Sequence, residues 1–559
     1  MSNVFPVILM LSSLVGVTGF KEASLGPKMK AEVGSGSQVL RLLNVEDYIY
    51  EHDDEDPESE DDLVVQFEEY ARDLGYENVD VQYFTTDTPE SMFNSVKMTP
   101  GAYDLICPSD YMIQKMASLD MLQEMDIDED HMPNYVNNAS QTIRNRLDNI
   151  SAVSTKTGET LYLGDYAVGY MWGTLGLTFD PSYGDRDPDT FIYDAMDWSI
   201  LWNPDYKGIA SIKDSVRDTY AIGLLYALND DFEENGQTVE GFETLMNKYN
   251  DGTYDADTYN QKFSDLFNRC DDATLEKVNK ALNKLKGNVF GMEVDSGKED
   301  IVTGKIGINF AWSGDAVNSM DTASAERDLD LYYSVPRTGS NIWMDAWCMP
   351  KSSSRSEAQV ELANLFLDFI STPEYTALNM EYSGYTPFIA GDEILELTRS
   401  WYDYRYDEET EEFNDITYSE EEMEELGLQE VDLKYFFEGT LSDEYDESAY
   451  TFYSDSYLPF TYENEEGEEV TNKCVGGTFF CQFPDEETIT RCAVMRDFGD
   501  QNEAVLKMWE KFKSDALPVW ATVLFIVELA LILGGVLYYF ISKHLNRKLR
   551  EKRRKLRNV

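Results

Sequence analysis

Apolar runs and amphipathic segments alternate over the first quarter of the chain. Residues 39–45 (VLRLLNV) form a short apolar run with strand character, and residues 63–75 (LVVQFEEYARDLG) carry apolar side chains at helical spacing. The same pattern recurs at 79–85 followed by 89–98, and at 103–111 followed by 112–122. This alternation predicts an α/β lobe with a largely parallel sheet. Such sheets bind ligands beyond the carboxyl ends of their strands, where NVEDY and PSDY lie.

The pattern continues in a second unit that begins near Gly164. Its expected elements are a strand at 208–214 (GIASIKD), helices at 215–228 and 276–289, a strand, turn and helix at 305–320, a strand at 341–350 (NIWMDAWCMP) and a long helix at 357–371. From about 390 to 472 the chain is acidic and rich in tyrosine, and we interpret this stretch as an inserted, irregular segment. The 559 residues suffice for two or more lobes with sizeable cores.

The strand at 341–350 raises a question of charge. Alternation places Trp343, Asp345, Trp347 and Met349 on one face, and Ile342, Met344, Ala346 and Cys348 on the other. A buried carboxylate between two indoles is costly unless something neutralises it. The partner is either an internal Arg or Lys, or a cation that arrives from outside, since indole rings attract cations.

The charge balance narrows the classes of partner. The chain has 45 basic and 106 acidic side chains, for a net charge of −61, so it repels nucleic acid and attracts cations. Solubility on a crowded exterior is an equally good reason for this acidity. A hydrophobic content of 42% with 13% aromatics excludes a mainly disordered protein.

Both ends of the chain carry apolar runs. The first, from Val4 to Phe20, predicts a signal peptide or an uncleaved N-terminal helix. The second, Pro518 to Ile541, would extend about 36 Å as a helix and predicts a transmembrane span. A strongly basic tail follows, which by the positive-inside tendency is cytoplasmic. We therefore expect a single-pass protein of the cell membrane whose acidic bulk lies outside the cytoplasm.

Cysteine and histidine positions bear on cross-linking and catalysis. Cys474, Cys481 and Cys492 are close enough in sequence for one disulfide, with Cys474 to Cys481 across CVGGTFFC as one candidate pair, and no cysteine spacing fits a zinc site. The chain has three histidines, none beside a Ser or Cys nucleophile motif, and it has no HExxH or phosphate-binding glycine loop. The acidic run at 52–62 lacks EF-hand spacing and is best interpreted as a solvated loop. We expect no enzyme, no cofactor and no metal site.

Seven segments in register resemble one family, the polyamine-binding (spermidine/putrescine) proteins of ABC importers. They are YDLICPSDYMIQKM, MWGTLGLTFD, DWSILWNPDYKG, the VRD helix start, INFAWSGDA, IWMDAWCMP and SGYTP, and the resemblance runs from about Leu40 to Pro387 and from Phe483 to Lys513. It implies a periplasmic-binding-protein type II-like fold, in which two α/β lobes joined by crossing strands close on a ligand in the cleft.

This resemblance implies a division of the chain. The expected parts are a signal peptide or N-terminal helix (1–22), the first part of lobe 1 (38–148), the first part of lobe 2 (149–312), the return to lobe 1 (313–389), the acidic insertion (390–472), the C-terminal part of lobe 2 (473–515), the transmembrane helix (518–541) and the basic cytoplasmic tail (542–559).

The resemblance also assigns ligand contacts. Asp345 would be the partner of an amine, with Trp343 and Trp312 beside the methylene chain. Further contact positions fall on Tyr48, Ser109, Tyr111, Asp218 and Tyr385. The chemistry agrees, because a polyamine is a string of ammonium groups separated by CH₂ runs and needs spaced carboxylates and aromatic walls.

Each assignment has a structural alternative. Asp345 could pair with a structural Arg, the tryptophans and tyrosines could be plain core aromatics, and Asp218 could serve the start of its helix. Three positions depart from the family pattern: Val45 replaces a common Trp, Ser215 replaces an acid that adjacent Asp214 could supply, and Met495 replaces a Gln. These changes leave the choice between putrescine and spermidine open.

The sequence thus predicts a membrane-anchored, extracytoplasmic solute-binding protein that delivers a polyamine to an ABC permease and its ATPase. The alternatives are a surface protein of the same fold that binds another cationic solute or a metal, an acidic adhesin, or an enzyme.

Overall fold

The computed structural model describes residues 38–514, except for 53–58, 77, 408–409, 411, 415, 458–460, 464–468 and 472–473. The predicted N-terminal segment (1–22), membrane span (518–541) and basic tail (542–559) lie outside these residues. Within the described part, no helix combines the length and the apolar character needed to cross a membrane. The chain divides into two compact units at Val505, and everything described below belongs to the first, except the part of α20 (Asn502–Lys513) that follows Val505.

One twelve-stranded sheet organises the first unit. Its main path runs in the order β10 (Gly291–Glu293), β7 (Ala210–Lys213), β11 (Ile308–Trp312), β6 (Ala167–Phe179), β13 (Ser340–Cys348), β3 (Leu105–Ile106), β1 (Gln38–Asn44) and β2 (Val79–Thr85). The remaining strands of this sheet are β12 (Tyr332–Ser334), β14 (Thr386–Pro387), β21 (Val475–Gly476) and β22 (Cys492–Ala493). Short hairpins are formed by β4 (Ser151–Val153) with β5 (Thr160–Tyr162) and by β8 (Phe232–Glu234) with β9 (Gln237–Val239).

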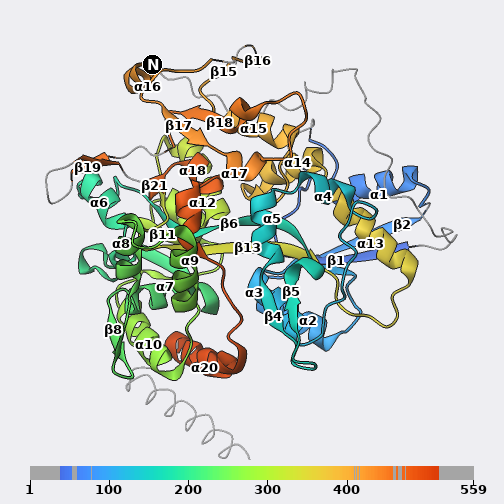
Figure 1. The fold of residues 1–559 in the computed structure, drawn as a ribbon, viewed down its shortest axis with the longest axis horizontal. Coiled ribbons are helices and arrows are strands. Elements are labelled where there is room, and N and C mark those ends of the chain that lie inside the picture. Colours follow the sequence, from blue (N-terminus) through green and yellow to red (C-terminus); the bar gives the residue numbers. More distant parts are fainter. Residues whose placement is uncertain are drawn as a thin grey trace, which may run out of the picture. The chain divides into compact units, whose positions relative to one another are not determined.

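The strand directions divide this sheet into two parallel halves. β1 pairs in parallel with β2 and β3, and β7 pairs in parallel with β10 and β11. Between the halves, β6 pairs antiparallel with β11 on one side and β13 on the other. Figure 1 shows β6 and β13 running between a group that contains α1, α13, β1 and β2 and a group that contains α7 to α10. Two α/β lobes joined by crossing strands therefore form this unit, as predicted.

Helices follow the strands of each half. The β1–β3 half is accompanied by α1 (Leu63–Asp73), α2 (Pro89–Met98), α3 (Asp110–Ser118), α4 (Pro133–Asn138), α5 (Gln141–Asp148), α13 (Glu357–Ile370) and α14 (Pro373–Ser383). The other half has α6 (Pro188–Ala195), α7 (Val216–Ala227), α8 (Phe242–Asn250), α9 (Ala256–Phe267), α10 (Asp272–Lys286), α11 (Gly297–Val302) and α12 (Ser313–Arg327). The 3₁₀ turns are η1 (Leu163–Asp165), η2 (Trp198–Trp202), η3 (Pro204–Tyr206), η4 (Glu447–Tyr450) and η5 (Gly499–Gln501).

The predicted alternation along β13 is confirmed by two separate hydrophobic clusters. Ile342, Met344, Ala346 and Cys348 join one cluster, and Trp343, Trp347 and Met349 join the other. The register against β6 shifts between Asp345 and Ala346, because Asp345 pairs with Met171 while Ala346 pairs with Gly169. The extra residue lies in β6, so the pairing is interrupted directly beside Asp345.

The acidic stretch after residue 390 contains short regular elements rather than the irregular chain that its composition predicts. They are α15 (Asp392–Tyr402), β15 (Tyr406–Asp407), β16 (Glu412–Phe413), α16 (Glu420–Leu426), β17 (Gln429–Asp432), α17 (Lys434–Phe437), β18 (Thr451–Ser454), β19 (Thr461–Glu463) and β20 (Glu469–Thr471). Phe436, Phe437 and Phe452 are fully buried in the same cluster as Trp172 of β6. These few aromatics order the segment, because each buries a large apolar area. The chain then continues through α18 (Thr478–Gln482), α19 (Glu486–Thr490) and α20 (Asn502–Lys513).

The predicted disulfide between Cys474 and Cys481 is wrong, because all six cysteines are thiols. Cys481 lies in α18, where its Sγ packs 3.9 Å from Met320 Sδ. The Sγ of Cys474 instead accepts a hydrogen bond of 3.7 Å from Arg491. The two thiols thus face different neighbours despite their closeness in sequence.

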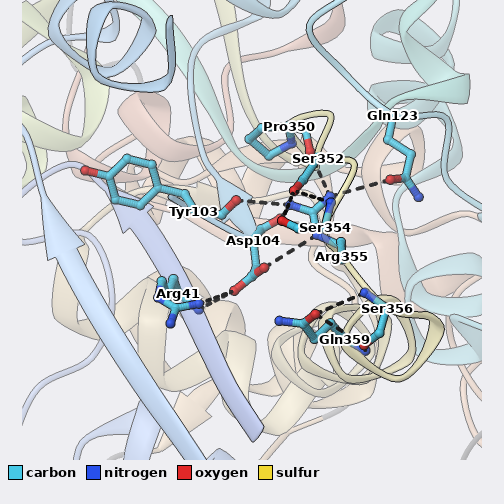
Figure 2. Close-up of polar contacts among 10 residues, drawn as sticks. All are labelled: Arg41, Tyr103, Asp104, Gln123, Pro350, Ser352, Ser354, Arg355, Ser356 and Gln359. Atoms are coloured by element: carbon cyan, nitrogen blue, oxygen red, sulfur yellow. Dashed lines mark hydrogen bonds and ion pairs between the residues drawn. The ribbon is translucent and has the colours of Figure 1, made fainter. Parts of the chain in front are cut away.

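A buried arginine fixes the chain that leaves β13. The side chain of Arg355 is 2% exposed and lies 3.5 Å from Asp104 Oδ1. It donates to the carbonyl oxygens of Pro350 at 2.7 Å and Tyr103 at 3.0 Å. Figure 2 shows this guanidinium at the centre of a network that also holds Arg41 against Asp104. Since Asp104 lies at the start of β3, the network clamps the end of β13 to its neighbouring strand.

Candidate functional site

Asp345 lies at the interrupted pairing of β13, where the two halves of the sheet meet. The hydroxyl of Tyr48 donates a 2.8 Å hydrogen bond to its Oδ2. Its other oxygen, Oδ1, is buried and finds no hydrogen-bond partner among the described residues. No Arg or Lys among the described residues acts on this carboxylate as a counter-ion. The structural alternative for Asp345, pairing with an internal Arg or Lys, is therefore not found among the described residues.

The pKa of Asp345 reflects the lack of a counter-ion. Burial raises the pKa of this carboxyl to about 6, although the nearby hydroxyls of Ser109 and Tyr48 favour the ionised form and oppose the shift. The charge of Asp218 raises this pKa further. The ionised form is thus costly at neutral pH, and an incoming cation would remove that cost.

Aromatic rings surround this carboxylate. The Tyr48 ring packs edge-to-face against Tyr385, with ring centroids 5.3 Å apart, and Tyr385 packs in the same way against Trp343 at 5.4 Å. The hydroxyl of Tyr170 donates to the Tyr48 carbonyl at 2.6 Å, and Trp343 Nε1 donates to the Thr174 carbonyl at 3.1 Å. These bonds hold the rings in place, so three of the predicted residues form one aromatic wall.

Glycines let the strands and helices approach the wall closely. A Cβ on Gly173 of β6 would lie 2.6 Å from Trp343 Cζ2. A Cβ on Gly314, in the first turn of α12, would lie 2.3 Å from Tyr385 Cδ1. Gly384 ends α14 in the left-handed conformation, with φ of 73°, and turns the chain directly before Tyr385. The glycines in MWGT, WSGD and SGYT thus shape the site.

A second carboxylate on the other side of Tyr385 is fully satisfied. The Tyr385 hydroxyl donates to Asp315 Oδ1 at 2.8 Å, and Lys213 Nζ donates to Asp315 Oδ2 at 3.0 Å. Lys213 also lies 3.2 Å from Glu293 Oε1. Sequence reasoning missed these three residues. A signal was present, because a Lys within the apolar strand GIASIK must be buried with partners.

Asp218 and Trp312 form a neighbouring pair. Burial raises the pKa of Asp218 to about 6, while hydrogen bonds from Ser215 and Trp312 and the charge of Lys213 lower it. Ser215 is the residue that caps α7, since its side chain accepts from the backbone N–H of Asp218. Ser215, which stands where the family pattern has an acid, therefore caps α7. Asp218 is the acid that the start of this helix contributes to the site.

Tyr111 is engaged by a resident cation. Its hydroxyl donates to Glu90 Oε1 at 3.3 Å, and the guanidinium of Arg217 lies 4.9 Å from its ring centroid. The guanidinium of Arg217 also lies 3.5 Å from the Phe498 ring centroid and donates to the Arg496 carbonyl.

The structure thus brings most of the predicted residues together. Those in direct contact are Tyr48, Ser109, Trp343, Asp345 and Tyr385. Asp218 and Trp312 lie beside them, and Tyr111 is turned toward Arg217.

Met495, one of the three departures from the family pattern, lies at this same end. Met495 is buried and lines a small cavity with Arg217, Tyr220 and Phe498. Its backbone carbonyl accepts a hydrogen bond of 2.9 Å from Gln114. Apolar packing and a resident guanidinium therefore replace the polar contacts that the family pattern implies there.

The fold is that of a periplasmic binding protein, in which two lobes are joined by crossing strands. A carboxylate without a counter-ion and several aromatic rings lie where the two lobes meet. The chain belongs to the bacterial extracellular solute-binding protein family, which matches residues 62–391. The resemblance seen in the sequence is thereby confirmed.

Named relatives agree with this family. The spermidine/putrescine-binding periplasmic protein of Escherichia coli (strain K12) is 23% identical over 331 residues, covering 59% of this chain and 75% of that protein. The protein of the same name from Salmonella typhimurium is 24% identical over 332 residues, with the same coverage of 59% and 75%. A putative spermidine/putrescine ABC transporter structure from Listeria monocytogenes covers 85% of this chain and 99% of its own, at 20% identity and a TM-score of 0.50, and shows the shared fold.

Proposed function

We propose that this chain is the membrane-anchored, extracytoplasmic binding component of an ABC importer, and that it captures a polyamine, putrescine or spermidine. It hands the polyamine to the permease and its ATPase without altering it chemically. One observation carries this proposal: Asp345 Oδ1 is buried and lacks a partner among the described residues, within a wall of aromatic rings.

An alkylammonium group matches these features. Its N–H donors would give Asp345 Oδ1 a charge-assisted hydrogen bond, which is among the stronger polar contacts in proteins. A desolvated ammonium beside an aromatic face gains up to about 2 kcal/mol. Each methylene buried against Trp343 or Tyr385 adds about 0.8 kcal/mol. A ligand of ammonium groups joined by CH₂ chains uses all of these terms.

Closure of the lobes would couple capture to delivery. Tyr48 and Ser109 come from the half of the sheet that contains β1 and β3, whereas Asp218 and Trp312 come from the half that contains β7 and β11. A ligand that contacts both sets holds the lobes together, and a permease can recognise that closed form. The net charge of −61 raises the local concentration of cations near the protein.

The relatives support the ligand class, since several are named for binding spermidine and putrescine. Membrane anchoring rests on the predicted span at 518–541 and the basic tail that follows it.

Calorimetry on the full-length protein in mild detergent tests the proposal. Putrescine or spermidine should bind at micromolar concentration or tighter, and Asp345→Asn should abolish that binding. Asp368→Asn is the matched control, because burial also raises the pKa of Asp368 to about 6 but its oxygens accept hydrogen bonds from Asn134, outside the aromatic wall. Undiminished binding in Asp345→Asn, or binding of a sugar or a divalent metal alone, would reject the proposal.

A further inference from the structure

One ammonium position of the site is already filled by a side chain of the protein. Lys213 ends β7, and its side chain is 0% exposed. Its Nζ lies 3.0 Å from Asp315 Oδ2, 3.2 Å from Glu293 Oε1 and 3.0 Å from the carbonyl oxygen of Val294. The same nitrogen lies 4.3 Å from the ring centroid of Trp312. Two carboxylates, a carbonyl and an indole thus surround one ammonium group.

A bound alkylamine would make these same contacts. The Lys213 side chain is four methylenes ending in an ammonium group, which is the aminobutyl group that putrescine and spermidine both contain. Because it is tethered to β7, its effective concentration at this position far exceeds that of any free amine. A free ligand therefore gains nothing from Asp315, or from the face of the Trp312 ring that Lys213 covers, unless Lys213 leaves.

A second lysine lies near this position. Lys298 lies 4.0 Å from Asp315 Oδ1 and 2.8 Å from Asp295. Lys213 and Lys298 thus face the carboxylates of Asp315, Glu293 and Asp295. With Tyr385 on its remaining oxygen, Asp315 has hydrogen-bond donors on both oxygens.

Among the predicted contact residues, two acids remain for a ligand. Asp345 has the unpartnered Oδ1, and Asp218 has hydrogen bonds from Ser215 and Trp312 with the Lys213 charge nearby. The charge of Asp218 raises the pKa of Asp345, because the two carboxylates repel each other. Each of the two carboxylates can accept charge-assisted hydrogen bonds from one ammonium group.

We propose that Lys213 acts as a built-in occupant of one ammonium position and restricts the ligand to a diamine of putrescine size, rejecting the third ammonium of spermidine. This inference rests on the proposed function and makes Lys213 a residue that determines specificity.

Two variants of the full-length protein test it by calorimetry with putrescine and spermidine. Lys213→Met combined with Glu293→Gln removes one buried charge of each sign, so the balance of charges is kept and Asp315 becomes available to a free ammonium. Lys213→Arg is the control that retains the charge. Thermal unfolding checks that each variant is folded.

The wild-type protein should bind putrescine at least tenfold more tightly than spermidine. The double variant should reduce that ratio at least tenfold by gaining affinity for spermidine, and Lys213→Arg should leave it unchanged. The inference is overturned if the wild type binds spermidine as tightly as putrescine, or if the folded double variant keeps the wild-type ratio. Should the double variant fail to fold, the wild-type ratio decides. Absence of binding by both amines to the wild type would instead reject the proposed function.

Discussion

The Tyr48 hydroxyl donates a 2.8 Å hydrogen bond to Asp345 Oδ2, joining residues that are 297 positions apart in the chain. This bond satisfies one oxygen of a carboxylate whose other oxygen is buried without a partner among the described residues. Asp315 provides the contrast, because Tyr385 and Lys213 occupy both of its oxygens. The two carboxylates should therefore respond to mutation in opposite ways.

Asp345→Asn should stabilise the ligand-free protein, because it removes a buried charge that lacks a counter-ion. Asp315→Asn should destabilise it, by about 3 kcal/mol, because it leaves the buried Lys213 with one carboxylate fewer. Urea unfolding of the two variants, without ligand, measures both changes. A loss of stability in Asp345→Asn would mean that this charge is already compensated.

Polyamine binding should weaken at acidic pH. The pKa values of Asp345 and Asp218 are each raised to about 6, so both carboxyls gain protons as the pH falls through that value. Each pH unit below the pKa lowers the ionised fraction of one group about tenfold. Affinity should therefore fall at least tenfold between pH 7.5 and pH 5, and binding near pH 6 should release protons.

The ligand-free protein should show the opposite trend in stability. Because these folded-state pKa values lie above the ordinary value of 3.8, the folded state holds more protons than the unfolded state between about pH 4 and pH 6. The contribution of these groups to the free energy of unfolding thus decreases as the pH rises through that window.

The pH dependence of binding is measured by calorimetry. Titrations with polyamine in buffers of different ionisation enthalpy count the protons released on binding. An affinity that is flat from pH 7.5 to 5 would contradict the raised pKa values.

Tyr48→Phe should shift the pH midpoint of binding upward. The ring packing is retained, but Asp345 loses a hydrogen bond that favours its ionised form. Tyr385→Phe is the matched variant, since its hydroxyl serves Asp315 and it should leave the midpoint in place. Equal shifts in both variants would show that the hydroxyls act only through packing.

Arg355→Met should destabilise the protein by about 3 kcal/mol, because Arg355 is almost completely buried and five acceptor oxygens lose their donor (Figure 2). Arg41→Ala should cost less than about 1 kcal/mol, since the Arg41 side chain is 36% exposed and lies 3.8 Å from the same Asp104. Urea unfolding compares the two. Similar costs would show that burial does not govern this network.

Gly173→Ala should weaken polyamine binding without unfolding the protein. The added Cβ would lie 2.6 Å from Trp343 Cζ2 and 2.3 Å from Ser313 Oγ, so the indole must move. Gly291→Ala is the control, because nothing lies within 4 Å of its Cβ position. Calorimetry with putrescine should show at least a tenfold loss for Gly173→Ala and none for Gly291→Ala. An unaffected Gly173→Ala would mean that Trp343 does not form the ligand wall.

Local sequence determined the elements and their faces. The predicted strand at 39–45 corresponds to β1 (Gln38–Asn44), and the two faces of β13 enter the two clusters that alternation assigns to them. These features depend on side-chain periodicity within a few residues, which a sequence displays directly. The resemblance to the binding-protein family likewise came from short motifs in register.

Pairings across the fold were decided only by tertiary structure. Lys213 and Asp315 lie 102 positions apart, and no local pattern shows which acid a buried lysine will meet. The register shift beside Asp345 and the pairing of Tyr48 with that carboxylate depend on how β6, β13 and the chain after β1 pack together. The sequence therefore identified Asp345 as a buried carboxylate that needs a positively charged partner. Only the fold could assign one internal lysine to Asp315 and leave Asp345 without one, because counter-ions are matched by distance in space rather than by position in the chain.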